Sequence, residues 1–200
     1  MKDRKKIWYS VAGGVNPDRE LRYYQRKNLD FCHTLTEHSA IIITEINDYL
    51  NKEVGSIKPY FNESMVERQS KKSHWRTNTF FLWLWRVKKN ERKCPKTIKI
   101  VRKIEGVLSC SISLLNPGVD IKEHHGDTNA IMRCHFPIQV PDGLPKCGFS
   151  VNGEERSWEE GKPLVFNDSA PHKAWNHSDR DRVVLIIDVV RPEFAKKKYW

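Results

Sequence analysis

The feature that most constrains the fold is a series of short apolar segments, separated by turn residues, in the second half of the chain. From Thr97 onward these segments are TIKIVRKI, VLSCSISLL, VDIKEH, AIMRCHFPIQV, CGFSV, KPLVF and RVVLIIDVV. They are broken at NPGVD, PDGLP and VNGEE, which are rich in residues that favour turns. Regularly spaced short strands of this kind are typical of a β-barrel or a double-sheet jelly roll.

The first part of the chain has a different pattern. The segment LTEHSAIIITEINDYL, residues 35–50, predicts an amphipathic helix with Thr36 as its cap. Its apolar residues at helical spacing are Ile42, Ile46, Tyr49 and Leu50. The segment TFFLWLW, residues 79–85, is too short to cross a membrane and is rich in strand formers. We therefore predict a mainly β fold with N-terminal helices, a double-stranded β-helix of the jelly-roll, cupin-like type.

The length of 200 residues fits a single domain with one core. Within residues 1–200 we expect a partly helical support region at 1–74, the jelly-roll core at 75–192 and a basic tail at 193–200. The hydrophobic fraction of 38% and the seven tryptophans indicate a folded protein, even though 30% of the residues are charged.

Charge and cysteine content indicate where the protein works. The basic start MKDRKKIWYS is not followed by an apolar run, so we expect neither a secretory signal nor a membrane span. The five cysteines lack metal-site spacing and suit reduced thiols, which favours a cytoplasmic location. The net charge of +10 would help contact with an anionic surface, but it lies mostly in runs typical of solvated surface. No nucleic-acid-binding motif is present, and nothing indicates an oligomeric state.

Polar residues cluster in IKEHHGDTNAIMRCH, residues 121–135. The stretch predicts a strand, a tight turn at Gly126 and a second strand on which Ile131, Arg133 and His135 share one face. His124 or His125 then lies beside that face. An exposed hairpin with solvated histidines is the alternative that this segment alone leaves open.

Two further residues complete a constellation. VFNDSAPHKAWN, residues 165–176, carries His172 after a polar turn, and Arg182 opens an apolar strand where an arginine needs an anionic partner. Two histidines on separate strands, followed by an arginine, are the elements of a non-haem iron site that binds an oxo-acid. The imidazoles hold Fe(II), and the guanidinium fork binds a carboxylate.

Three stretches together resemble the aspartyl/asparaginyl β-hydroxylase family of Fe(II)- and 2-oxoglutarate-dependent oxygenases. They are SLLNPGVDIKEHHGDTNAIMRCHFPIQVP, WEEGKPLVFNDSAPHKAWN and RVVLIIDVVRP, and the resemblance covers about residues 75–192, including CPKT at 94–97. It implies a dioxygenase that uses O2, converts 2-oxoglutarate to succinate and hydroxylates an unactivated C–H bond, with the protein supplying ligands, orientation and shelter.

The resemblance also implies roles for individual residues. His124, seven positions after Pro117 and eleven before His135, matches the first iron ligand, and His172 matches the second. Arg182 matches the residue that binds the far carboxylate of 2-oxoglutarate. The positions that match 2-oxoglutarate contacts are Ser113, Arg133, His135 and Arg182. Ser113 and His135 taken alone fit hydrogen-bonded core residues equally well.

The sequence departs from the usual iron triad, because Gly126 stands where a carboxylate normally follows the first histidine by two residues. Some members of the family also have glycine there and work with two histidines and water. His125-Gly126-Asp127 is a competing triplet, but neighbouring strand residues point to opposite faces, so both registers cannot bind one metal. We favour His124. Asp168 fits a turn or an outer partner of the site better than a ligand.

The predicted function is hydroxylation of an amino-acid side chain in a peptide, a protein or a free amino acid. A lipid acyl-chain hydroxylase of the lipid A-modifying type and a non-catalytic jelly-roll binding protein are the alternatives. The basic surface suits a lipid, whereas the missing apolar anchor does not.

The position of Ile131 bears on the substrate. In the peptidyl-aspartate branch of the family, a basic residue at this position helps to bind the acidic side chain of the substrate. Isoleucine cannot pair with a carboxylate, so we expect a neutral target unless Arg76 or Arg86 takes that role.

Overall fold

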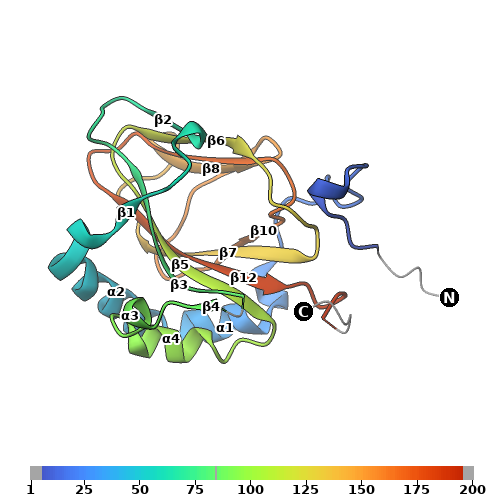
Figure 1. The fold of residues 1–200 in the computed structure, drawn as a ribbon, viewed down its shortest axis with the longest axis horizontal. Coiled ribbons are helices and arrows are strands. Elements are labelled where there is room, and N and C mark those ends of the chain that lie inside the picture. The colour runs from blue at the N-terminus through green and yellow to red at the C-terminus, as the bar shows by residue number, and fades with distance from the viewer. Residues whose placement is uncertain (1–5, 84, 196–200) are drawn as a thin grey trace.

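The computed structural model describes residues 6–83 and 85–195. Two β-sheets face each other, and helices lie along the outer side of the larger one (Figure 1). The strand order is β1-β3-β5-β12-β7-β10 in the larger sheet, where β4 also pairs with β3, and β2-β6-β11-β8-β9 in the smaller sheet. The double-sheet jelly roll predicted from the sequence is therefore confirmed.

The strands follow the apolar segments of the sequence closely. The larger sheet contains β1 (Lys58–Pro59), β3 (Trp75–Leu82), β4 (Trp85–Arg86), β5 (Val107–Leu115), β7 (Ile131–Gln139), β10 (Leu164–Phe166) and β12 (Arg182–Val190). The smaller sheet contains β2 (Val66–Arg68), β6 (Val119–His124), β8 (Cys147–Val151), β9 (Glu154–Arg156) and β11 (His172–Asn176). All sheet pairs are antiparallel.

The central strand β12 shows why the larger sheet has two buried faces. Leu185 and Ile187 point outward, into a hydrophobic cluster shared with the helices. Val184 points inward, into a second cluster between the sheets. Because both faces are covered, the strand is an almost unbroken apolar run.

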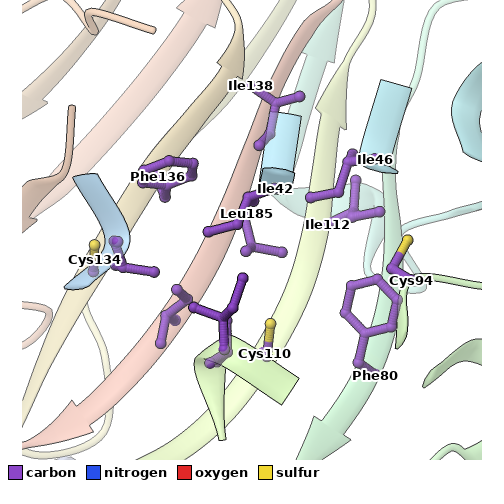
Figure 2. Close-up of a cluster of buried hydrophobic side chains, with 14 of the residues drawn as sticks. Ile42, Ile46, Phe80, Cys94, Cys110, Ile112, Cys134, Phe136, Ile138 and Leu185 are labelled. Atoms are coloured by element: carbon purple, nitrogen blue, oxygen red, sulfur yellow. The ribbon is translucent and has the colours of Figure 1, made fainter. Parts of the chain in front are cut away.

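The helices cover the outer face of the larger sheet. They are α1 (Asp30–Glu37), α2 (Ser39–Glu53), α3 (Lys88–Glu91) and α4 (Pro95–Val101), with short 3-10 turns η1 (Ser10–Ala12), η2 (Arg26–Asn28), η3 (Val54–Ser56) and η4 (Glu63–Met65). Figure 2 shows Ile42 of α2 next to Leu185 of the sheet and Ile46 of α2 next to Ile112, and all four belong to one hydrophobic cluster. Removing these apolar groups from water contributes the main stabilisation of this layer.

The helix expected over residues 35–50 is present with different boundaries. The helical region is divided at His38, and Thr36 lies inside α1 rather than at a cap, with its Oγ1 donating to the Cys32 carbonyl at 2.8 Å. All four residues of the expected apolar stripe are buried: Ile42, Ile46, Tyr49 and Leu50.

The prediction of a strand at TIKIVRKI, residues 97–104, is wrong. Residues 95–101 form α4, which begins with Pro95, a residue well suited to the first helical turn. The Glu45 carboxylate of α2 accepts hydrogen bonds from the backbone N–H groups of Lys96 and Thr97, at 2.9 and 2.6 Å. A contact between helices thus satisfies the exposed N–H groups at the start of α4.

The N-terminal arm, residues 6–22, fastens the loop between β10 and β11. The Asn167 side-chain amide donates to the carbonyls of Asp18 and Leu21, and its backbone N–H donates to the Arg22 carbonyl. The Asn16 amide donates to Ser169 Oγ at 2.9 Å. Residues far apart in the sequence therefore fix the position of this loop.

Other expectations concern the cysteines, the tail and the membrane. The five cysteines are all buried and free, as expected of reduced thiols. Residues 196–200 of the expected basic tail lie outside the described residues, and the division at 74 and 192 stays a prediction. Over residues 6–83 and 85–195, the helices are too short or too polar to cross a membrane.

Candidate active site

A narrow cavity of about 40 Å³ lies between the two sheets. All six residues predicted for the site line it, and they come from both sheets: Ser113, His124, Arg133, His135, His172 and Arg182. The remaining lining residues are mostly aromatic or aliphatic, among them Trp75 and Phe149. The fold thus brings together side chains that are far apart in the sequence, such as Ser113 and Arg182, which are 69 positions apart.

His124 and His172 are cross-strand partners in the smaller sheet. They face each other across β6 and β11, and their ring centroids are 4.2 Å apart. Each Nδ1 lies 2.8 Å from a backbone carbonyl two residues earlier, that of Lys122 or Ala170. Because Nδ1 donates to this carbonyl, Nε2 keeps a lone pair available for a metal. Burial lowers the pKa of both imidazoles, so they are neutral, as ligands must be.

His125 and Asp127 lie outside the cavity. His125 is exposed, and its ring centroid is 6.1 Å from that of Trp8. The Asp127 carboxylate accepts a hydrogen bond from Ser10 Oγ of the N-terminal arm. Among the residues that the structure describes, no three His, Cys, Asp or Glu side chains converge as a metal site. His124 faces His172 in the cavity and His125 does not, and the binding of a metal by His124 and His172 stays a prediction.

Gly126 and Asp168 share the space beside the histidine pair. The Gly126 N–H donates to the Asp168 carbonyl at 2.7 Å, and Asp168 Oδ1 lies 3.7 Å from His172 Nε2. A Cβ added at Gly126 would lie 1.8 Å from Asp168 Oδ2. The Asp168 carboxylate thus occupies the place that a side chain at position 126 would need. Burial raises the pKa of this carboxyl group, and its ion pair with Arg133 at 2.6 Å opposes the effect.

Substitution of Gly126 by alanine should destabilise the protein. We expect a loss of about 1–3 kcal/mol in the free energy of unfolding, because the new methyl group overlaps a buried carboxylate that Arg133 and the backbone hold in place. Gly126→Asp, which restores the usual triad sequence, should destabilise at least as much and bind iron no better. Urea unfolding and anaerobic Fe(II) titration measure both effects.

Gly55→Ala is the matched control, because nothing lies within 4 Å of a Cβ at that position and its φ is not positive. It should unfold at nearly the wild-type urea concentration. A Gly126→Ala protein as stable as wild type would show that Asp168 does not hold the position described.

Arg182 lies at the deep end of the cavity and is only 1% exposed. Its Nη1 is 3.4 Å from Ser113 Oγ, which also accepts a hydrogen bond from Trp75 Nε1 at 3.0 Å. The guanidinium carbon lies 4.8 Å from the centre of the Trp158 ring. No hydrogen-bond partner among the described residues reaches Nε or Nη2. Burial lowers the pKa of Arg182 to about 10, so it remains charged at neutral pH and suits an anionic ligand.

His135 is held in one tautomer beside Arg182. Trp158 Nε1 donates to His135 Nδ1 at 3.2 Å, which leaves the proton on Nε2 as a donor. Burial and the nearby charge of Arg182 lower the pKa of His135 well below its usual value. Sequence reasoning missed Trp75 and Trp158 as site residues. Trp158 opens the quoted WEEGKPLVF stretch, and a tryptophan whose N–H must be satisfied when buried was the available signal.

Arg133 is neutralised by two carboxylates. Its Nη1 pairs with Asp168, and its Nε donates to Asp188 Oδ1 at 2.7 Å. The side chain is 26% exposed, whereas Arg182 is 1% exposed, so the Arg133 end of the cavity is more exposed than the Arg182 end. Contact between Arg133 and 2-oxoglutarate stays a prediction.

Comparison with known proteins agrees with this arrangement. The family model described as "Aspartyl/Asparaginyl beta-hydroxylase" matches residues 36–192, which is most of the chain. The chain belongs to the aspartyl/asparaginyl β-hydroxylase family. The match contains every residue that lines the cavity.

Individual relatives in this hydroxylase family differ in what they are named for. The ornithine lipid ester-linked acyl 2-hydroxylase of Rhizobium tropici is 36% identical over 136 residues, 67% of this chain and 48% of that protein. The human aspartyl/asparaginyl beta-hydroxylase is 31% identical over 140 residues, 66% of this chain and 18% of that protein. The chain therefore spans less than half the length of either relative.

A solved structure, the prolyl-4-hydroxylase of Pseudomonas putida, matches with a TM-score of 0.49 and 14% identity. The match covers 76% of this chain and 87% of that one, and it is too weak to bear on function.

Proposed function

We propose that the protein is an Fe(II)- and 2-oxoglutarate-dependent dioxygenase that hydroxylates an amino-acid side chain in a peptide, a protein or a free amino acid. The observation that carries the proposal is that one cavity contains two neutral imidazoles and a buried guanidinium whose Nε and Nη2 have no hydrogen-bond partner among the described residues. The two imidazoles suit a divalent transition metal, and the guanidinium suits a carboxylate.

The residues of this chain fit the two groups that the family implies. His124 and His172 would hold iron through Nε2, and Arg182 would bind the far carboxylate of 2-oxoglutarate with Ser113 and His135 beside it. When bound, iron with 2-oxoglutarate supplies the O2 activation that hydroxylation requires. Phe149 and Phe166 pack against His172, with ring centroids 5.9 and 5.1 Å away, and exclude water from that side.

Apart from the exposed Lys173 on β11, which also lines the cavity, the basic side chains considered for an acidic substrate are already paired or point away from it. Ile131 is buried on β7, two residues before Arg133. Arg133 already pairs with two carboxylates. Arg86 pairs with Glu91 of α3, and Arg76 follows Trp75, so strand alternation points it away from the cavity. We infer that the target side chain is neutral.

A lipid acyl chain is the second candidate substrate. The relative from Rhizobium tropici is named for a lipid acyl chain, and its match covers 67% of this chain. An acyl carbon is also neutral and apolar, so it needs no basic partner.

A substrate panel tests the proposal. Purified protein with Fe(II), O2 and 2-oxoglutarate should form succinate, and a product heavier by one oxygen atom should appear by mass spectrometry. The panel contains peptides that differ only in an aspartate, asparagine or leucine target, and ornithine lipid in mixed micelles. We expect the neutral targets to be used at least about tenfold faster than aspartate, which corresponds to the cost of about 1.4 kcal/mol or more for an unpaired carboxylate.

Each result separates two alternatives. A preference for aspartate would overturn the inference from Ile131, and use of the lipid alone would select the second candidate. Oxygen-independent or absent succinate formation with every substrate would support a non-catalytic binding protein and contradict the proposal.

A further inference from the structure

The hairpin between β3 and β4 exposes large apolar side chains to solvent. Leu82, Trp83, Trp85 and Val87 are all exposed, and Trp85 is 82% exposed. Single exposed apolar residues are ordinary on protein surfaces, but a cluster on one hairpin marks an interaction site. We name Leu82, Trp83 and residues 85–87 the tryptophan hairpin; Leu84 lies outside the described residues and is not part of the proposed surface.

A basic surface continues directly from the tryptophan hairpin into α3 and α4. In residues 82–104 the single acidic residue is Glu91, which is buried and paired with Arg86 and Arg102. The exposed basic residues of the same stretch are Arg86, Lys88, Lys89, Arg92, Lys96, Lys99, Arg102 and Lys103. Exposed basic side chains, among them Lys88 and Lys89, therefore lie beside exposed indole rings, while Arg92 and Lys96 share a groove with the acidic residues of α2.

The tryptophan hairpin lies at the same end of the larger sheet as the exposed end of the cavity. Strand register aligns Leu82 with Ser109, Ser109 with Asp188, and Asp188 with Arg133. Arg182 is aligned with Leu115 and Trp75 at the other end of these strands. Figure 1 shows β3, β5, β12 and β7 side by side, with β4 next to β3. A surface that binds the hairpin would thus lie at the Arg133 end of the larger sheet.

We propose that the tryptophan hairpin and α3 dock the protein on an anionic lipid bilayer. Tryptophan rings are favourable at the level of lipid headgroups, where an apolar face and a polar N–H are both satisfied. Lysine and arginine side chains are attracted to the negative surface of anionic lipids. A nucleic acid or an acidic peptide would match the charge but would leave Leu82 and Val87 in water. The docking surface is outside the cavity and does not depend on the proposed iron chemistry.

Vesicle flotation with the full chain tests the docking surface. Vesicles of phosphatidylglycerol and phosphatidylcholine, at about 0.1 M salt, should bind the protein, whereas pure phosphatidylcholine vesicles should bind it weakly. Trp85→Ser should lower the affinity for anionic vesicles roughly tenfold, and Lys88→Glu with Lys89→Glu should lower it by about 25-fold or more, since each basic group contributes about fivefold. Brominated lipid should quench tryptophan fluorescence in wild type and less in Trp85→Ser.

Matched controls come from the opposite end of the larger sheet. Phe61 is 87% exposed and follows Tyr60, whose N–H donates to the Trp75 carbonyl, and Lys71 and Lys72 are exposed in the loop before β3. Phe61→Ser and Lys71→Glu with Lys72→Glu should bind vesicles like wild type. Failure of wild type to bind anionic vesicles would overturn the proposal. So would unchanged binding by Trp85→Ser, which would indicate a contact made by charge alone.

Discussion

Replacement of His172 by alanine is expected to abolish iron binding and turnover. His172 supplies one of two imidazoles in the cavity, and a single remaining histidine cannot chelate the metal. Loss of an outer partner of a metal ligand already costs about 10–100-fold in affinity, so loss of the ligand itself should exceed about 100-fold. Anaerobic titration with Fe(II) measures the affinity, and succinate formation measures turnover. His124→Ala should behave in the same way.

His125→Ala is the matched control for this prediction. His125 is exposed and lies next to Trp8 rather than in the cavity, so its loss should leave iron binding and most activity unchanged. Because His172 is buried against Phe149 and Phe166, His172→Gln keeps side-chain volume and separates ligand loss from a packing defect. An inactive His125→Ala protein together with an active His124→Ala protein would refute the assignment of the ligands.

Replacement of Arg182 by methionine should weaken 2-oxoglutarate binding and yet not destabilise the free protein. A lost charge-assisted interaction costs about 1.5–3 kcal/mol, which raises the half-saturating concentration of 2-oxoglutarate by roughly 10–150-fold. Without the ligand, however, Arg182 is a buried cation with two nitrogens that lack partners among the described residues. Replacing a buried charge with an apolar side chain of similar size is often neutral or stabilising.

Two measurements on the same proteins check both effects. Urea unfolding without ligand should give Arg182→Met a midpoint at or above that of wild type, and an oxygen-consumption assay should give the shifted 2-oxoglutarate requirement. Arg182→Lys should recover part of the binding, because it keeps the charge but loses the planar fork. Arg180→Met, on an exposed arginine next to the strand, should change neither value. An unchanged 2-oxoglutarate requirement in Arg182→Met would remove this residue from the site.

The strands could be predicted because the burial of their faces and the turn residues at their ends both leave a pattern in the sequence of the strand itself. RVVLIIDVV coincides with β12 because both of its faces are buried, and VDIKEH coincides with β6 because turn residues follow it. TIKIVRKI was misassigned because a short apolar run fits two periodicities, and the contact that favours a helix there comes from Glu45 in α2. A local pattern does not contain that distant carboxylate.

The sequence indicated which residues lie in the candidate site, but it did not predict how they contact one another. Resemblance to the family identified six of the residues that line the cavity, and their roles in binding stay predictions. The contact between Gly126 and Asp168 joins residues 42 positions apart through the packing of two loops, so no spacing rule predicts it. The pairing of Arg133 with Asp188 across β7 and β12 likewise depends on strand register. Trp158 contacts His135 through the tertiary fold in the same way.

The N-terminal arm, residues 6–22, holds the loop between β10 and β11 in place. Any fragment prepared for study should therefore include this arm. The region by which the family is recognised begins at residue 36, after the arm has ended. A fragment cut there would keep both histidines, but the buried Asn167 would lose the carbonyls of Asp18 and Leu21 that its amide binds. Such buried donors are costly when unpaired. The region that identifies the family is therefore shorter than the region that folds as one unit in this chain. A truncated protein should keep the longer of the two.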